Sequence, residues 1–145
     1  MVETPETYLG SARASGFVNG AVPNGETDFG FVGDRVLPHL PPNAFAYQGT
    51  WRVAPDSAAA VDRSRIDASF GAEKVFFVLG SPDEERKLEV RLDGQPIPNR
   101  FAGPDVKDGV ATIGKQRLYR LVDLPKVERH TLTLIPERGI SGYAF

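Results

Sequence analysis

The stretch Lys87-Leu-Glu-Val-Arg-Leu-Asp93-Gly-Gln-Pro-Ile-Pro98 decides the predicted fold. Its apolar residues Leu88, Val90 and Leu92 alternate with charged ones, which is the pattern of a strand with one buried and one solvated face. The pair Asp93-Gly94 then predicts a tight turn, because glycine adopts positive φ without steric cost. A strand with one polar face is typical of an antiparallel sheet that is packed on one side only.

Segments of the same kind recur along the chain. We expect strands over residues 45–53, 58–61, 65–70, 74–79, 87–92, 110–113, 116–122, 130–135 and 140–145. Gly49 predicts a bulge in the first of them, residues 62–64 and 71–72 predict turns, and Pro125 predicts a break. Short strands with frequent turn signals and almost no helical period predict an all-β fold. We expect a two-sheet antiparallel β-sandwich, a jelly roll, with one short helical turn near the N-terminus.

The N-terminal third differs from the rest in composition. Residues 4–7, Thr-Pro-Glu-Thr, carry a helix-start signature, since threonine caps and proline suits the first helical position. The glycine-rich residues 14–34 predict a loop or short edge strand, and residues 37–43 predict an extended connector. We therefore expect residues 1–43 to form an arm packed on the body of a single domain that spans residues 1–145.

Composition excludes several classes of function. The chain has 145 residues, a formal net charge of −2 with both signs interspersed, and no cysteine. This charge balance argues against a nucleic-acid footprint, and the lack of cysteine excludes thiol chemistry within the chain. No apolar run approaches the ~20 residues that span a membrane, so we expect no direct membrane insertion. Because the sequence stops at Tyr143-Ala-Phe145, inside a predicted strand, we expect it to be a piece of a longer protein.

The sequence offers no catalytic constellation. There is no Gly-x-Ser-x-Gly motif, and His39 and His130, the only histidines, lie in unrelated contexts. Among the 19 acidic residues no pair stands out as the two carboxylates of a glycosidase. We therefore predict no catalytic residue, no metal site and no cofactor.

Aromatic and polar side chains on strands give the candidate ligand-binding residues. Tyrosine and tryptophan on a β surface can stack on the apolar face of a sugar, and arginine or glutamine can bind its hydroxyl or carboxylate groups. The candidates are Tyr47, Trp51, Arg91, Gln95, Arg117 and Tyr119. The alternative for the three rings is a place in the core, since Tyr47 and Trp51 share the apolar face of their strand. For the arginines the alternative is an ion pair, as between Asp105 and Arg117.

A series of short blocks resembles the C-terminal part of the bacterial DipZ proteins. The blocks, in the family's order, are Thr4-Pro-Glu-Thr-Tyr-Leu-Gly10, Leu40-Pro-Pro-Asn43, Gly49-Thr-Trp-Arg-Val53, Leu92-Asp-Gly-Gln-Pro96, Ala102-Gly-Pro-Asp-Val106, Arg117-Leu-Tyr-Arg-Leu121, His130-Thr-Leu132 and Gly142-Tyr-Ala-Phe145. The resemblance implies a β-sandwich, similar to carbohydrate-binding modules, that follows a thioredoxin-like domain in a membrane thiol-disulfide protein related to cytochrome c biogenesis. It implies an extracytoplasmic location. The family's redox Cys-x-x-Cys has no counterpart in this chain.

Two functions follow from the resemblance. In the first, a non-catalytic accessory domain binds glycan and so localises the redox domain; this predicts an exposed aromatic platform. In the second, the domain docks on its thioredoxin-like neighbour or mediates dimers, without binding sugar. Phe17, Phe29 and Phe31 in the glycine-rich arm are the predicted contacts of that second function.

Overall fold

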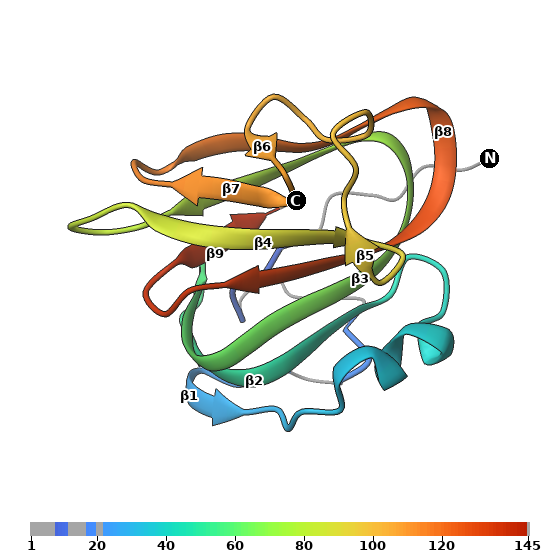
Figure 1. The fold of residues 1–145 in the computed structure, drawn as a ribbon. Coiled ribbons are helices and arrows are strands. Elements are labelled where there is room, and N and C mark those ends of the chain that lie inside the picture. The colour runs from blue at the N-terminus through green and yellow to red at the C-terminus, as the bar shows by residue number, and fades with distance from the viewer. Residues whose placement is uncertain (1–7, 12–16, 20–21, 145) are drawn as a thin grey trace.

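The computed structural model describes residues 8–11, 17–19 and 22–144, and more than half of them belong to antiparallel strands (Figure 1). The elements are β1 (Gly25–Asp28), the 3₁₀ helix η1 (Gly33–His39), β2 (Phe45–Val53), β3 (Ala58–Gly80), β4 (Arg86–Leu92), β5 (Gln95–Pro96), β6 (Val106–Lys107), β7 (Val110–Ile113), β8 (Arg117–Pro136) and β9 (Ser141–Ala144). In Figure 1, η1 and β1 lie at one end of the molecule, and β6 and β7 lie at the other.

The strands form one hydrogen-bonded sheet rather than two. The described strands follow the order β1-β2-β3-β8-β4-β7-β6, with β5 attached to β4 and β9 attached to β3. The mostly β, antiparallel prediction is confirmed, but the expected two-sheet jelly roll is not what the pairing shows. The physical reason is the length of two strands: β3 has 23 residues and β8 has 20, and their pairing continues from one half of the molecule into the other.

The predicted turns inside these long strands are irregularities of the ladder. Arg63 has a φ of 50° next to a shift in the β2–β3 register, so the signal at residues 62–64 marks a bulge. A second shift falls between Ala72 and Lys74, in place of the predicted turn at residues 71–72. Pro125 does not end β8, because residues 124–127 have no partner across β3 and the missing proline N–H costs no ladder bond.

Strand β9 closes the sheet on itself. Gly142 is paired with Ala58 at the start of β3 and also with Leu79 at its end, so the two ends of β3 flank β9. The sheet is therefore folded over, and apolar residues from its distant parts meet inside. Leu88 and Leu134 of the β4–β8 pair contact the same interior as Trp51 and Phe77, with an unfilled gap of only about 10 Å³ between them.

The strand on which the fold was predicted behaves as expected. Leu88, Val90 and Leu92 are buried in β4, while Glu89 and Arg91 between them are partly exposed. The predicted turn follows, with positive φ at both Asp93 (52°) and Gly94 (83°). The alternation on Leu132 and Leu134 of β8 is likewise confirmed, since both are buried.

The described part of the N-terminal arm is packed on the body. Leu9 is fully buried, and Tyr8 forms a bridge with Ala144 of β9. Phe17 forms a parallel β-bridge with Phe45. The Asn19 side-chain amide accepts from the Tyr47 backbone N–H at 2.8 Å and donates to the Tyr47 carbonyl at 3.1 Å. The predicted helix start at residues 4–7 lies outside the described residues.

The short helix lies at residues 33–39, where the sequence predicted extended chain from residue 37. The prediction relied on Pro38, since the residue before a proline is biased away from helical geometry. Tertiary hydrogen bonds override this bias. The Gln48 side chain accepts from the N–H groups of Val32 and Gly33, at 2.7 and 2.9 Å, and donates to the Gly33 carbonyl at 3.0 Å.

The bulge at Gly49 generates a prediction about stability. Gly49 and Gly30 both have positive φ, 76° and 80°, but a Cβ on Gly49 would lie against the Arg63 carbonyl, whereas among the described residues nothing lies within 4 Å of one on Gly30. Gly30→Ala should cost ~1–2 kcal/mol through its backbone conformation alone. Gly49→Ala should cost ~3 kcal/mol or more, because overpacking adds to that strain. Urea unfolding of both variants measures the difference, and equal losses would show that the contact with Arg63 is unimportant.

Candidate binding site

The second half of β3 and the first half of β8 expose apolar side chains on their outer face. Along β3, Phe77 and Leu79 point into the core, so the residue between Val75 and Phe77 points outward. That residue is Phe76, which is 37% exposed, and Leu118 on β8 is 48% exposed. These are two of the few large apolar side chains that the described chain leaves open to solvent.

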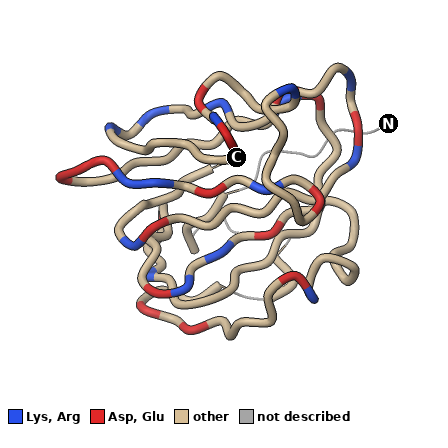
Figure 2. Tube along the Cα trace, viewed as in Figure 1, with Lys and Arg blue, Asp and Glu red and all other residues tan. Residues whose placement is uncertain are grey.

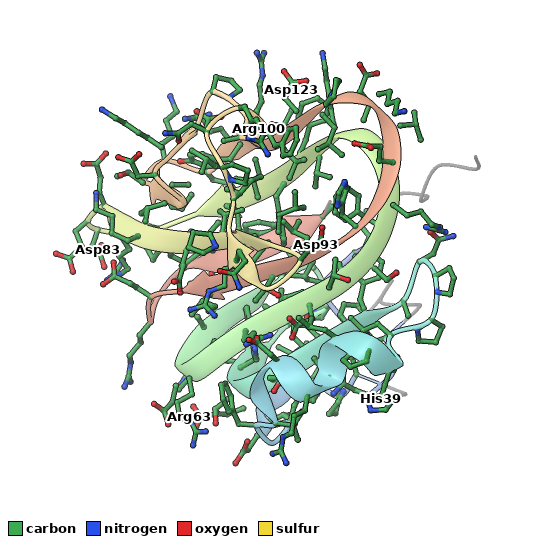
Figure 3. The ribbon with its side chains drawn as sticks, turned by 45° about the vertical axis from the view of Figure 1, so that its right-hand side comes forward. His39, Arg63, Asp83, Asp93, Arg100 and Asp123 are labelled. Carbon is green, nitrogen blue, oxygen red and sulfur yellow. The ribbon has the colours of Figure 1, made fainter. Side chains whose placement is uncertain are left out.

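Phe76 and Leu118 line a groove of about 530 Å³. The lining residues are Lys74, Phe76, Pro104, Leu118, Arg120, Val122 and Asp123. We call this site the Phe76–Leu118 groove. In Figure 3, Asp123 lies at the opposite end of the molecule from His39, the last residue of η1.

Charged side chains edge the groove. Lys74 lies opposite Asp123 in the β3–β8 register, and Arg120 lies opposite Phe76. In the described part of the chain, neither Lys74 nor the Arg120 guanidinium forms an ion pair. Elsewhere Lys and Arg alternate with Asp and Glu along the trace (Figure 2). The groove therefore has apolar side chains at its centre, with the cations Lys74 and Arg120 and the carboxylate of Asp123 at its edge.

A clamp between Asp105 and Arg117 fixes one wall of the groove. The Arg117 guanidinium donates to both Asp105 carboxylate oxygens, at 3.0 and 3.4 Å, and Asp105 also accepts from the Arg120 backbone N–H at 2.7 Å. The expected pairing of Asp105 with Arg117 is thus confirmed. Partial burial alone would raise the pKa of Asp105, but the hydrogen bonds from Arg117 and Arg120 outweigh it and lower the pKa. The bond to Asp105 raises the pKa of Arg117. The clamp holds the loop that carries Pro104.

The three predicted platform rings lie in the core. Tyr47, Trp51 and Tyr119 are 1–2% exposed. Tyr47 is stacked between Phe17 and Phe29, with ring centroids 4.7 and 4.9 Å away, and burial raises its pKa. These rings therefore offer no face to a sugar, in agreement with the alternative that the core contains them.

The polar groups of these buried rings are satisfied internally. The Tyr47 hydroxyl donates to the Leu9 carbonyl at 2.8 Å, and the Trp51 indole N–H donates to the Gln48 carbonyl at 2.9 Å. The Tyr119 hydroxyl donates to the Lys115 carbonyl at 2.8 Å. Tyr47 thus links β2 to the N-terminal arm, whereas Trp51 and Tyr119 bond to carbonyls three and four residues away along the chain. All three roles are structural.

The other predicted ligand-binding residues do not converge. Arg91 is partly exposed and pairs with Glu89 at 3.1 Å, and Gln95 is exposed on β5 beyond the following turn. Arg117 is 48% exposed, but its guanidinium is held by Asp105 and lies 3.9 Å from the centre of the Tyr119 ring. Only Arg117 lies beside the groove.

The predicted docking phenylalanines are mostly structural. Phe17 is 7% exposed, and both Phe17 and Phe29 stack on Tyr47, so they belong to the core. Phe31 is 42% exposed, and the Arg63 guanidinium lies 4.3 Å from its ring centre. Of the three, only Phe31 remains on the surface, at the η1 end of the molecule.

A buried polar network beneath η1 was not anticipated from the sequence. Asp67, fully buried, accepts from Arg65 at 2.9–3.1 Å, from Gln48 at 2.9 Å and from Thr133 at 2.6 Å. Burial alone would lower the pKa of Arg65, but its hydrogen bonds with Asp67 and Asp34 raise it. The network is satisfied by its own members and fastens η1 to the sheet. The sequence pattern that could have indicated this network is the row of polar residues that β2 and β3 place on the same face of the sheet.

The described residues contain no cluster of metal-binding type. No group of three or more His, Asp or Glu is arranged to hold a metal ion there. His39 ends η1, and His130 Nδ1 lies 2.6 Å from an Asp93 carboxylate oxygen at a strand edge. None of the described helices has the length and hydrophobicity required to cross a bilayer.

The sequence from residue 4 to residue 145 matches the family described as "Thioredoxin like C-terminal domain". This match covers nearly the whole chain. The chain belongs to the thioredoxin-like C-terminal domain family. A comparison with curated proteins found no match.

As a thioredoxin-like C-terminal domain, the chain is an accessory part of thioredoxin-like proteins. It has no cysteine, so it contains no redox site of its own. Family membership implies association with a thioredoxin-like domain. The Phe76–Leu118 groove is one exposed apolar site on the described surface, and Phe31 and Val32 form another.

Sequence reasoning missed the groove residues for a specific reason. The run from Lys74 to Leu79 is apolar on both faces, and this pattern predicts a strand that is central in its sheet. The segment is central, since β8 and β9 flank it, but its outer face is open. Phe76 and Val78 therefore did indicate a second apolar face. The sequence does not show whether another part of the same chain or an external partner covers that face.

The Asp105–Arg117 clamp generates a pH-dependent prediction. Because the pKa of Asp105 is lower in the folded than in the unfolded protein, the carboxylate stabilises the fold above the ordinary value of 3.8, and this contribution is lost as the pH falls through the lowered pKa. Asp105→Asn should therefore lower the free energy of unfolding by ~1 kcal/mol at pH 7 and by much less near pH 2. Urea unfolding at both pH values measures this. Asp83→Asn, in an exposed loop, is the control, and an equal loss at both pH values would contradict the clamp.

Proposed function

We propose that this chain is a non-catalytic docking domain for the thioredoxin-like domain of its parent protein. Two findings support the proposal: the family is that of C-terminal domains of thioredoxin-like proteins, and the described surface carries the Phe76–Leu118 groove. The groove is the observation that carries the proposal, because contiguous exposed apolar side chains are typical of interaction sites.

The chemistry of the groove favours protein over sugar. A sugar site needs a flat ring with polar groups around it, yet Tyr47, Trp51 and Tyr119 are buried. The groove instead combines one half-exposed ring with aliphatic side chains, and its charges lie at the edge. This arrangement, an apolar centre inside a charged rim, is the usual anatomy of a protein–protein interface.

We further propose that the parent is an extracytoplasmic thiol-disulfide oxidoreductase of the DipZ type, tethered through a membrane-embedded part. The support is the ordered series of sequence blocks and the absence of cysteine, which places any redox chemistry in another domain. A reporter enzyme that is active only outside the cytoplasm, fused to the parent protein after residue 145, tests this location. An inactive reporter on a stable fusion would contradict it.

The proposed function predicts the outcome of an NMR titration. The ¹⁵N-labelled chain is titrated with the thioredoxin-like domain of the parent and, in parallel, with bacterial cell-wall and simple oligosaccharides. We expect saturable amide shifts with the protein and a flat response to sugars up to millimolar concentration, because the predicted platform rings Tyr47, Trp51 and Tyr119 are buried.

Each other outcome has a definite meaning. Saturable shifts with a sugar and none with the thioredoxin-like domain would overturn the proposal and make the chain a carbohydrate-binding module. A flat response to both would also overturn it. Bovine serum albumin at the same concentration is the control for non-specific contact with apolar surface.

A further inference from the structure

The sequence contains two Asn-Gly pairs, Asn19-Gly20 and Asn24-Gly25, both in the glycine-rich part of the arm. In an Asn-Gly pair the backbone nitrogen of the glycine reaches the side-chain carbonyl carbon of the asparagine easily, because glycine has no side chain and a wide choice of backbone conformations. Asparagine accordingly counts among the thermolabile residues of proteins. The two pairs share this chemistry, so the surroundings of each asparagine decide which one reacts.

The side chain of Asn19 is held by two hydrogen bonds. Its oxygen accepts from the Tyr47 backbone N–H at 2.8 Å, and its nitrogen donates to the Tyr47 carbonyl at 3.1 Å. Tyr47 lies in β2 and is 1% exposed. The nitrogen that would have to leave is therefore bound to the sheet, and both bonds must open before the Asn19 side chain turns away from β2.

The side chain of Asn24 lacks this anchor. It is exposed, its oxygen accepts a hydrogen bond from the Ser11 hydroxyl, and within the described residues its nitrogen has no hydrogen-bond partner. Gly25 has a φ of 96° and is the first residue of β1, a four-residue strand at the edge of the sheet. The ends of such strands open at little cost in free energy, so the Gly25 nitrogen is released without any disturbance of the core.

From this contrast we infer that Asn24 is a site of spontaneous deamidation. The Gly25 backbone nitrogen attacks the Asn24 side-chain carbonyl carbon, a C–N bond forms, and the amide nitrogen leaves as ammonia with the proton of the Gly25 N–H. The product is a five-membered succinimide. Water then adds to one of its two carbonyl carbons and breaks a C–N bond, which gives aspartate or isoaspartate. Water is the only co-reactant, and the reaction involves no oxidation or reduction.

Both products change the start of β1. Aspartate adds a negative charge two residues before Glu26, whose carboxylate lies 3.0 Å from the Arg52 guanidinium. Isoaspartate also inserts one methylene group into the main chain just before Gly25, and this disturbs the pairing of Gly25 with Val53. The isoaspartate form therefore loses the end of β1 from the sheet. The inference is independent of the proposed function, since it concerns β1 and not the Phe76–Leu118 groove.

The test compares the two asparagines within one folded sample. The chain is incubated at pH 8 and 37 °C and then digested with trypsin, which leaves both asparagines in the peptide between Arg13 and Arg35. Tandem mass spectrometry locates the gain of ~1 Da that accompanies each deamidation. Asn24→Gln is the matched control, because the longer side chain would have to close a six-membered ring and reacts far more slowly.

We expect Asn24 to react ~10-fold faster than Asn19, or more, since two hydrogen bonds oppose the reaction at Asn19. In 8 M urea the two rates should become similar, because Tyr47 no longer holds Asn19. The Asn24→Gln variant should lose most of the mass gain of the folded chain. Equal rates at the two asparagines in the folded chain would overturn the inference. Much slower reaction of Asn24 in the folded chain than in urea would also overturn it, because β1 would then protect the site.

Hydrogen exchange tests the effect on β1. Ion-exchange chromatography collects the modified chains by their added charge, and the isoaspartate fraction is compared with the Asn24→Asp variant, which has the charge without the extra methylene group. Residues 25–28 should lose protection in the isoaspartate fraction and keep it in Asn24→Asp. Equal protection in the two would contradict the expected loss of pairing.

Discussion

Strands β3 and β8 pair from Ile66–Leu134 to Leu79–Arg117, and both halves of the molecule share this ribbon of backbone hydrogen bonds. The ribbon is bent where residues 124–127 have no partner across it, and β9 then joins the two ends of β3. Backbone polar groups inside a protein need partners, so a strand this long can enclose a core only if its neighbours follow the bend. The inner face that results is filled by side chains from distant parts of the described chain, Leu9 included. The polar network under η1 and the Phe76–Leu118 groove then lie at opposite ends of the molecule.

Several sequence blocks of the DipZ resemblance contain a glycine at which two backbone segments approach closely. A Cβ on Gly10 would meet the backbone at residues 55–57, one on Gly103 would meet the Arg120 carbonyl, and one on Gly142 would lie 2.6 Å from a Leu9 methyl group. With Gly49 against Arg63, each of these glycines lies where two segments touch. The blocks therefore describe how the chain is folded. They describe little about a ligand, and no sugar-binding position follows from them.

Strands were predictable wherever one face is buried and the other is exposed to solvent, as in β4. In such strands the alternation of apolar and polar residues matches the alternation of buried and exposed side chains. Prediction failed where a local signal was outweighed by tertiary contacts. Pro125 was expected to end a strand, but its position in the ladder requires no N–H. Pro38 was expected to keep the chain extended, but Gln48 holds that segment as a 3₁₀ turn. For the site, Asp105 and Arg117 were paired correctly because they flank the short strand β7. The groove was missed because an apolar outer face and a buried face look identical in sequence.

The apolar side chains at Phe76, Val78 and Leu118 are not required by folding. In a strand whose inner residues Phe77 and Leu79 already fill the core, the intervening outward positions contribute little to burial, and polar side chains would serve the ladder as well. Phe76, Val78 and Leu118 nevertheless form a contiguous apolar face, edged by Lys74, Arg120 and Asp123. By contrast, at the η1 end each buried charge has its partner, with Arg65 between Asp67 and Asp34. The η1 end therefore satisfies its buried charges internally, whereas the Phe76–Leu118 groove leaves apolar side chains open to solvent.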